Sequence, residues 1–222
     1  HLGVVFQNRY NNTSQKAKEL IDRGELGEIK GIKGIVTWHR DQAYYQQDPW
    51  RGKWYTEGGG VLINQSIHTL DLIQWLGGGV KAVKGSFDTR VLENVIEVED
   101  TAEATLYYQN GAVGLFYATN CFTTNSPIEI EIHGENGSLK ITDNDLILIK
   151  DGEISNLQDD DTETNYKTYW GKGHETLIND FYKNIEEENK NYITVKEGIK
   201  SLEIIEGIYE SARTNKKYEC KM

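Results

Sequence analysis

The chain has 222 residues, and its 24 Lys and Arg against 35 Asp and Glu give a formal net charge of −11. This length can bury a sizeable core in one or two domains. The acidic balance argues against nucleic acid and anionic membranes as main partners, since both require a basic surface on the protein. No apolar run in the sequence approaches the roughly 20 residues that cross a bilayer. Two cysteines, Cys121 and Cys220, favour a reducing cytoplasm over a secreted, disulfide-bonded protein.

The first residues predict a short strand over residues 2–7. They lack an initiator Met, and they lack the charged start and long apolar core of a signal peptide. The sequence also lacks the glycine fingerprints that bind dinucleotides or triphosphates. We therefore expect a fragment of a longer protein, with no dinucleotide fingerprint of its own.

The next segments predict a helix over residues 12–23 and a strand over residues 29–38. Asn12, Thr13 or Ser14 can cap the helix, and Gly24 can end it. The strand is indicated by alternating apolar positions. Residues 39–55 are rich in aromatic side chains and have no regular period, so we expect a loop.

The middle of the chain is predicted to form strands over residues 80–90, 100–109, 112–122, 128–134, 138–142 and 145–150. The dipeptides at 110–111 and 136–137 are both Asn-Gly, a strong signal for tight hairpin turns. Consecutive strands joined by tight turns make an antiparallel sheet. Residues 151–174 are acidic and irregular.

Two helices are expected after this stretch, over residues 175–188 and 196–214, and a last short strand over 218–221. Thr194 and Glu197 form a capping box for the second helix. We expect the two helices to bury Leu177, Ile178, Phe181 and Ile185, and Ile199, Leu202, Ile205 and Ile208. With helices at both ends and strands between, the sequence predicts an α+β fold with a large, mostly antiparallel, open-face sheet and helices packed on one face.

One stretch carries the strongest functional signal. Gly58-Gly59-Gly60 leads into residues 61–76, and Gly77 follows, which predicts a helix that begins close against a neighbour and ends sharply. Its apolar residues cover most of the circumference, so the helix should be buried. One narrow stripe of the helix is polar and contains Asn64, His68 and Asp71, which follow one another at spacings of four and three residues. Trp75 continues the stripe four residues further on.

A polar stripe on a buried helix must face either a polar partner inside the fold or a binding site. A single histidine there is most often a hydrogen-bonded core residue. The three glycines favour a site, because they leave backbone amides bare where a ligand can approach. On the residues alone, both interpretations of His68 stay open.

The pattern Gly58-Gly59-Gly60-Val61-Leu62-Ile63-Asn64-x-x-x-His68-x-x-Asp71 resembles the signature of the glucose–fructose oxidoreductase, inositol dehydrogenase and MocA (Gfo/Idh/MocA) family. Further segments resemble the same family, and together they span essentially the whole chain. They are residues 5–10, 23–29, 50–54, 173–175 and 208–212.

The resemblance implies a two-domain NAD(P)-dependent oxidoreductase acting on sugars, polyols or their derivatives. Residues 1–222 resemble only the second domain, which carries substrate contacts and the oligomer interface, with residues 1–10 as the crossover from an N-terminal Rossmann domain absent from this chain. The family's Glu-Lys-Pro motif, whose lysine contacts the reacting hydroxyl, is likewise absent from the sequence. NAD or NADP would be bound mainly by the other domain, and a homodimer or homotetramer would form through the open sheet face.

By the same resemblance His68 is the general acid/base, and Gly58, Gly59 and Gly60 approach the cofactor. Asn64 stands where many members have Asp. An amide cannot take a proton as a carboxylate can, although it still donates and accepts hydrogen bonds. His68 is then the one group of the stripe that exchanges a proton near neutral pH.

Substrate contacts are expected from Tyr45, Trp50, Arg51, Trp54, Asp71 and His174. Sugars present flat C–H faces that stack on aromatic rings, and Tyr44 lies in the same loop, although such a cluster can also be simple packing. Arg51 and Lys53 would meet hydroxyls or an anionic group, or form a solvated surface pair. Asp71 would orient His68 or a backbone group, or serve as a structural partner, and His174 could equally cap a loop.

Two functions other than an oxidoreductase also remain open from the sequence. The chain could be a non-catalytic sugar-binding or dimerisation module of the same fold. A metal hydrolase using His39, His68, Asp71 or His174 is also conceivable. The sequence has no His-x-x-x-His pair and no cysteine cluster, so we expect no metal site.

Overall fold

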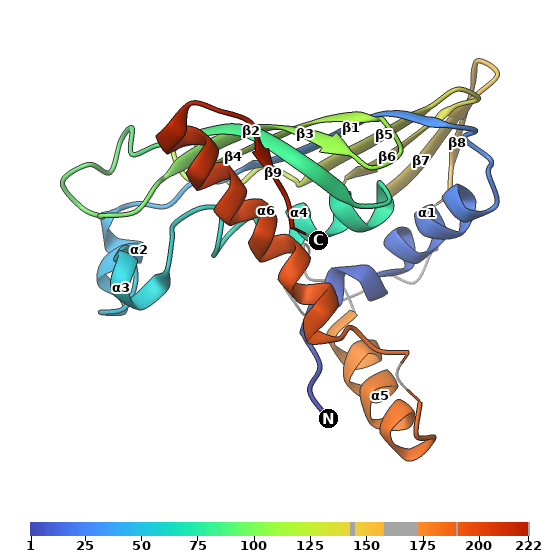
Figure 1. Cartoon of the computed structure of the whole chain (residues 1–222), viewed down its shortest axis with the longest axis horizontal. Coiled ribbons are helices and arrows are strands. Elements are labelled where there is room, and N and C mark those ends of the chain that lie inside the picture. Colours follow the sequence, from blue (N-terminus) through green and yellow to red (C-terminus); the bar gives the residue numbers. More distant parts are fainter. Residues whose placement is uncertain (143–144, 158–172, 190, 222) are drawn as a thin grey trace.

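A computed structural model of the chain describes residues 1–142, 145–157, 173–189 and 191–221, and these form one large sheet with helices beneath it (Figure 1). The strands are β1 Ile29–Thr37, β2 Val80–Asp88, β3 Thr101–Tyr108, β4 Val113–Thr119, β5 Glu129–Gly134, β6 Ser138–Thr142, β7 Asp145–Lys150, β8 Glu153–Asn156 and β9 Tyr218–Glu219. The helices are η1 Gln7–Tyr10, α1 Asn12–Asp22, α2 Gln42–Gln46, α3 Trp54–Glu57, α4 Ile67–Leu76, α5 Gly173–Glu186 and α6 Val195–Thr214.

The strands of the described residues lie in the order β8-β7-β6-β5-β1-β4-β3-β2-β9. Neighbouring pairs are antiparallel except β1 and β4, which run parallel. β1 therefore joins two antiparallel units, one built from β2 to β4 with β9 at its edge and one from β5 to β8.

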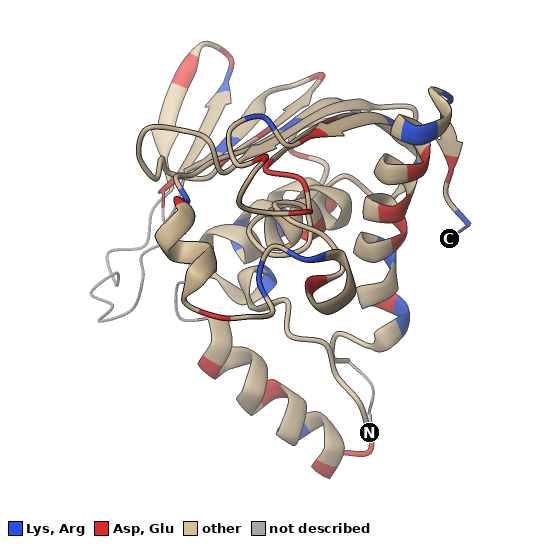
Figure 2. Ribbon diagram, turned by 90° about the vertical axis from the view of Figure 1, so that its left-hand side faces the viewer, with Lys and Arg blue, Asp and Glu red and all other residues tan. Residues whose placement is uncertain are grey.

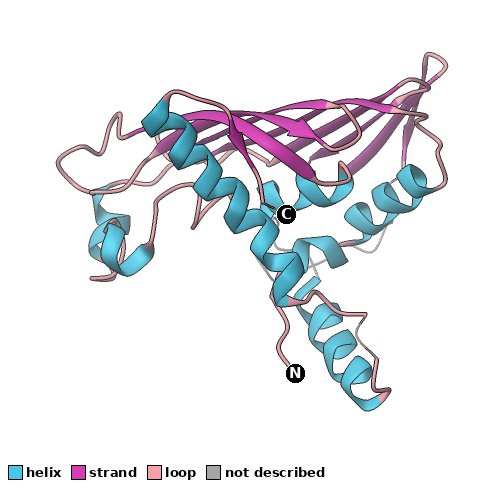
Figure 3. Ribbon diagram, viewed as in Figure 1, coloured by secondary structure: helices cyan, strands magenta, loops and turns pink. Residues whose placement is uncertain are grey.

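One face of the sheet packs on helices, and the other is left open (Figure 3). On β1 the buried residues Ile32, Gly34 and Val36 point to the helices, in register with Gly114, Phe116 and Ala118 of β4. Gly34 leaves room for α4, since a Cβ there would lie 3.1 Å from the side chain of Ile73. Close packing of this kind holds α4 in a fixed position under the sheet.

The predicted α+β class and the predicted sheet and helix arrangement are confirmed. Acidic and basic positions both occur along α6, whereas the charged positions of α5 are mostly acidic (Figure 2). No helix among the described residues is long and apolar enough to span a membrane.

Several local predictions are wrong. Residues 2–7 form a single bridge, between Gly3 and Thr194, and then enter η1. The expected loop at 39–55 contains α2 and the start of α3, helices too short to show a period. The irregular stretch 151–174 contains β8 and the start of α5, while 158–172 lie outside the described residues.

The expected helix of the central stretch begins late, at Ile67 and not at the glycines. Residues 61–65 form turns, in which the Val61 N–H is bonded to the Glu99 carbonyl and the Asn64 N–H to the Gly60 carbonyl. Three of the apolar residues assigned to the helix cores are also about half exposed, namely Ile178, Ile199 and Leu202 at 49%, 51% and 48%.

Candidate active site

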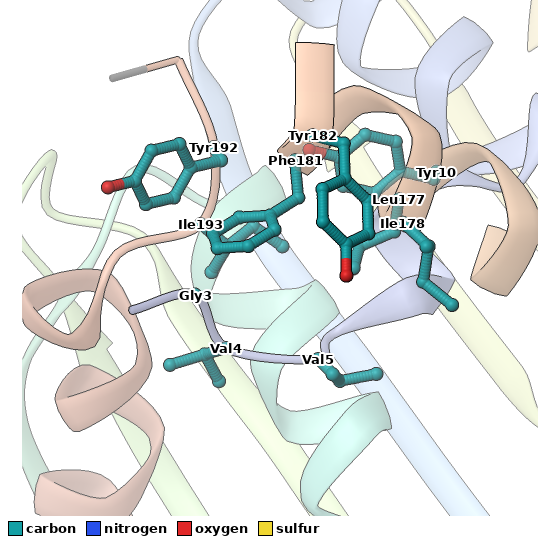
Figure 4. A pocket seen from close by; sticks show the side chains of 10 residues that line it. All are labelled: Gly3, Val4, Val5, Tyr10, Leu177, Ile178, Phe181, Tyr182, Tyr192 and Ile193. Atoms are coloured by element: carbon teal, nitrogen blue, oxygen red, sulfur yellow. The ribbon is translucent and has the colours of Figure 1, made fainter. Parts of the chain in front are cut away.

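Two cavities differ in chemistry. The first has a volume of about 300 Å³ and lies between the N-terminal segment and α5 (Figure 4). Aliphatic and aromatic side chains line it, and its polar side-chain groups are tyrosine hydroxyls. One of these, on Tyr10, donates a hydrogen bond to Asp180, and burial raises its pKa. Such a cavity offers no group that exchanges protons near neutral pH.

The second cavity, of about 420 Å³, contains His68 and is the candidate active site. It is built from η1, the segment after β1, the aromatic segment around α2, the turn before α4, and the start of β5. The lining residues are Gln7, Asn8, Trp38, Arg40, Tyr44, Trp50, Arg51, Asn64, Gln65, His68 and Ile128.

His68 is the second residue of α4 and is half-buried, with its ring edge-on to Phe6 at a centroid distance of 5.7 Å. Burial lowers the pKa of His68, the Asp71 carboxylate opposes this shift, and His174 adds to it. Its Nδ1 atom is shielded from solvent and has no hydrogen-bond partner among the described residues. A molecule in the cavity can therefore reach the imidazole only at Nε2, and the ring is neutral near pH 7.

Two arginines and three aromatic rings form one side of the cavity. The Arg51 guanidinium lies 4.2 Å from the ring centre of Tyr44 and 4.8 Å from that of Trp50, and its Nε donates to Asp48 at 2.9 Å. On the other side of the cluster, the Arg40 guanidinium lies 5.0 Å from the ring of Tyr44 and 5.0 Å from that of Trp38.

These contacts hold the guanidinium groups in place through cation–π attraction. Arg51 is neutralised by Asp48 at 2.9 Å, whereas no carboxylate of the described residues lies within 4.0 Å of Arg40. Arg40 is therefore a guanidinium of the cavity wall with no ion-pair partner in the described part of the chain.

Asn64 also lines the cavity. Its Nδ2 atom donates to the Glu57 carboxylate at 2.5 Å, and the other oxygen of Glu57 accepts the Gly52 N–H at 2.5 Å. The carboxylate that the sequence lacks at position 64 is thus supplied by a neighbour, Glu57.

The expectation of bare amides at the three glycines is wrong. The Gly60 N–H is bonded to both carboxylate oxygens of Glu99, at 3.0 and 2.9 Å, and the Leu62 N–H to one of them at 3.0 Å. Tyr209 donates its hydroxyl to the same group at 2.9 Å. A Cβ at position 60 would lie 1.9 Å from the Glu99 carbonyl oxygen, so the glycine leaves the room that the buried Glu99 backbone needs.

Gly59 and Gly60 are therefore inside the fold and do not line the cavity, and Gly58 is an exposed helix end with φ of 84°. Burial raises the pKa of Glu99, and its four hydrogen bonds counter that shift. Sequence reasoning missed Glu99, although a pair of acids, Glu99-Asp100, directly before an apolar strand was a visible signal.

Asp71 serves as a structural partner. It is 1% exposed and accepts two hydrogen bonds from Arg9, at 2.7 and 2.6 Å, and one from Ser201 at 3.0 Å. Arg9 belongs to η1, so this ion pair ties η1 to α4 and places Gln7 and Asn8 in the cavity wall. Of the predicted stripe, His68 and Asn64 reach the cavity and Asp71 does not.

Of the remaining predicted substrate contacts, some line the cavity and others do not. Trp50 and Arg51 line the cavity, whereas Tyr45 is buried against Asn120 and Trp54 packs against Tyr209 at a centroid distance of 5.4 Å. His174, at the start of α5, is half-buried and near enough to His68 to affect its pKa.

Sequence reasoning also missed several lining residues. They are Gln7, Asn8, Trp38, Arg40, Gln65 and Ile128. Gln7 and Asn8, polar residues inside a short apolar segment, were the most visible signal among them.

Solved structures share this fold. The WlbA dehydrogenase from Bordetella pertussis, in complex with NADH and UDP-GlcNAcA, is 31% identical, with a TM-score of 0.80 over 100% of this chain and 63% of its own. A WlbA dehydrogenase from Chromobacterium violaceum, with the same two ligands, matches at 31% identity and a TM-score of 0.83, also over 100% of this chain and 63% of its own. A levoglucosan dehydrogenase, at 23% identity and a TM-score of 0.87 over 99% of this chain and 66% of its own, shares the fold.

The chain belongs to the Gfo/Idh/MocA oxidoreductase family, whose C-terminal alpha/beta domain matches residues 18–220. It is also 27% identical over 154 residues to an uncharacterized oxidoreductase, sll0816, of Synechocystis, a match covering 64% of this chain and 40% of the relative. The chain spans less than two thirds of the length of each WlbA relative.

Proposed function

We propose that this chain is the substrate-binding and catalytic domain of an NAD(P)-dependent oxidoreductase that acts on a sugar, a polyol or a sugar derivative. The observation that carries the proposal is His68, a neutral imidazole held in a cavity of this family's C-terminal domain. The donor set fits hydride transfer to nicotinamide, because that chemistry needs one base near neutral pH and His68 is the one cavity residue of this kind. NADH in the two WlbA structures supports the same cofactor class.

The chain's own residues perform the proton transfer. The bound nicotinamide supplies the acceptor for hydride from the substrate carbon. His68 takes the hydroxyl proton at Nε2 in the oxidation and returns it in the reverse direction. The nearby Asp71 carboxylate favours the imidazolium that forms, since it opposes the lowering of the pKa of His68. A base positioned in this way contributes about 10²–10⁴ in rate.

The unpaired Arg40 guanidinium favours a substrate with an anionic group. Arg40 has no carboxylate within ion-pair distance in the described part of the chain, and it is held in the cavity wall by Trp38 and Tyr44. A guanidinium of this kind suits a carboxylate or phosphate group. UDP-GlcNAcA, bound in both WlbA relatives, is a sugar acid that carries a diphosphate.

The test uses the intact oxidoreductase, its cofactor domain included. We expect His68→Asn to lower kcat by about 10²–10⁴-fold while NADH binding, followed by fluorescence, is unchanged. Wild-type turnover in His68→Asn would contradict the assignment of the base. If no anionic or neutral sugar is oxidised by the wild-type protein but one binds, the non-catalytic binding module is the better description.

The open face of the sheet supports a homodimer or homotetramer. Four large apolar residues on its outer side are 39–72% exposed, namely Val113, Leu115, Ile149 and Ile154. Alternation along β4 and β7 and pairing of Ile149 with Ile154 place them on this face. Exposed apolar residues gathered on one face mark an association surface.

A further inference from the structure

We propose that Glu57 is a positioning residue, which turns Asn64 so that its carbonyl oxygen, and not its NH₂ group, faces the substrate. The inference rests on the proposed function of the cavity. It assigns a role to Glu57, which does not line the cavity itself. It also requires that the substrate carry a hydrogen-bond donor opposite Asn64.

The orientation of the Asn64 amide follows from its partner. An ionised carboxylate has no proton to donate, so the group that contacts it at 2.5 Å must be the NH₂ end of the amide. Glu57 is itself fixed, because its second oxygen accepts the Gly52 N–H at 2.5 Å. The two hydrogen bonds leave neither side chain free to turn.

The backbone supports the same arrangement. Glu57 is the last residue of α3, and the chain reverses at Gly58 with a φ of 84°. Asn64 is held by its own N–H, which bonds to the Gly60 carbonyl at 3.0 Å. With both backbones fixed, the side-chain contact is set by the turn between them.

Because Asn64 lines the cavity and its NH₂ group is bonded to Glu57, we infer that its oxygen is the atom available to a bound molecule. No donor among the described residues is bonded to it, and Asn64 lines the cavity together with His68. A hydrogen-bond acceptor at this position pairs with a substrate hydroxyl or N–H. The site should therefore bind a substrate that has a donor here and reject the analogue that has lost it, as buried acceptors generally do.

This contact also accounts for Asn in place of Asp at position 64. A carboxylate at that position would lie against the Glu57 carboxylate, and two such groups in contact cannot both be ionised without a large cost. The Asn64 amide removes that repulsion and keeps an oxygen for the substrate.

The test exchanges the two side chains in the intact oxidoreductase, with the variants Glu57→Gln, Asn64→Asp and the double variant. Glu57→Gln can donate or accept, so the orientation is lost, and we expect KM to rise about fivefold with kcat nearly unchanged. Asn64→Asp should lower kcat/KM about tenfold at pH 8 and recover as the pH falls and the pair shares a proton. In the double variant the amide now at position 57 donates to the carboxylate now at position 64, and kcat/KM should return to within about threefold of the wild type.

A second readout does not depend on turnover. We expect the thermal midpoint of Asn64→Asp without substrate to fall between pH 5 and pH 8, since the paired carboxylates destabilise the folded state once both are ionised. The double variant should lose this pH dependence. Glu93→Gln, the same change of charge at an exposed loop position, is the control and should change neither readout.

The proposal is overturned if the fold-losses in kcat/KM of the two single variants multiply in the double variant. It is also overturned if the thermal midpoint of Asn64→Asp does not depend on pH. Absence of turnover in the wild-type protein with every sugar would reject the proposed function instead, and the midpoint measurement would still decide whether Glu57 and Asn64 are coupled.

Discussion

At His68, burial and nearby charges decide which form of the imidazole is present. The ring lies edge-on to Phe6, its Nδ1 atom is shielded from solvent, and the residue lines the cavity. A low-dielectric environment disfavours the imidazolium. A histidine in this position is available as a base over the whole neutral range.

The pH dependence of the reaction should reflect this environment. The pKa of His68 is lowered from 6.5, mainly by burial, so the neutral base persists below that pH and is lost only when the pH falls through the lowered pKa. We expect the acidic limb of kcat/KM for oxidation to lie below pH 6.5. His174→Gln should move the limb upward, because the charge of His174 lowers the pKa of His68. An acidic limb above pH 6.5 would contradict the burial of the base.

How much of the site could be predicted depends on where its residues lie in the sequence. The spacing of Asn64 and His68 grouped these two residues, while Trp50 and Arg51 were expected from the aromatic segment before the glycines and from the family resemblance. Arg40, which lies ten residues before Trp50 in an aperiodic segment, reaches the cavity through a sheet register that no local pattern encodes. Gln7 and Asn8, the η1 residues of the cavity wall, are placed by the ion pair between Arg9 and Asp71, which lie far apart in the sequence.

The ion pair of Arg9 and Asp71 joins two elements, η1 and α4. The side chains are 6% and 1% exposed, and both hydrogen bonds between them are short. Breaking one side of such a pair leaves an uncompensated buried charge.

We expect Asp71→Asn to lower the free energy of unfolding by about 3–5 kcal/mol, because the buried Arg9 guanidinium would keep only the more exposed Glu197 carboxylate, at 3.6 Å, as an ionic partner. Urea unfolding measures this loss. Glu19→Gln, in the exposed pair with Lys16 on α1, is the comparison and should change the free energy by less than about 1 kcal/mol. A loss for Asp71→Asn as small as that of Glu19→Gln would show that the pair is not a structural link.

At the level of elements, the strands and the long helices were predictable because hydrophobic alternation and capping residues are local signals. β6 and β7 were placed at their observed bounds, and the capping box at Thr194 marks the start of α6. The start of α4 was not predictable, since the turns before it are bonded to Glu99, which lies 39 residues after Gly60.

Across the whole molecule, the sheet divides the chain into a helix-covered face and an open one (Figure 3). On the open face, a salt bridge between Lys33 and Glu131 at 2.9 Å lies beside the exposed apolar residues of β4. An apolar patch with charges of both signs can pair with a copy of itself around a two-fold axis.

We expect Leu115→Lys to dissociate the proposed oligomer of the intact protein, because it places a charge on each copy at the centre of the open face. Leu115 is 51% exposed on β4. Light scattering after size-exclusion chromatography would show the mass falling to that of one subunit. Val91→Lys, at a loop position that is 70% exposed, should leave the mass unchanged. An unchanged mass in Leu115→Lys would place the interface elsewhere.

The position of β1 between β4 and β5 has a consequence for folding. Apart from the edge strand β9, each strand of the two antiparallel units has a neighbour close in sequence, but Gly31 of β1 pairs with Val113 and His133, far along the chain. Pairings over such distances form late, because closing a long loop costs entropy before contacts compensate it. The two units can therefore form first, and β1 then inserts between them. Trp38 and Arg40 directly follow β1, so the cavity acquires this wall in the same event that completes the sheet, and the protein cannot finish folding without assembling its site.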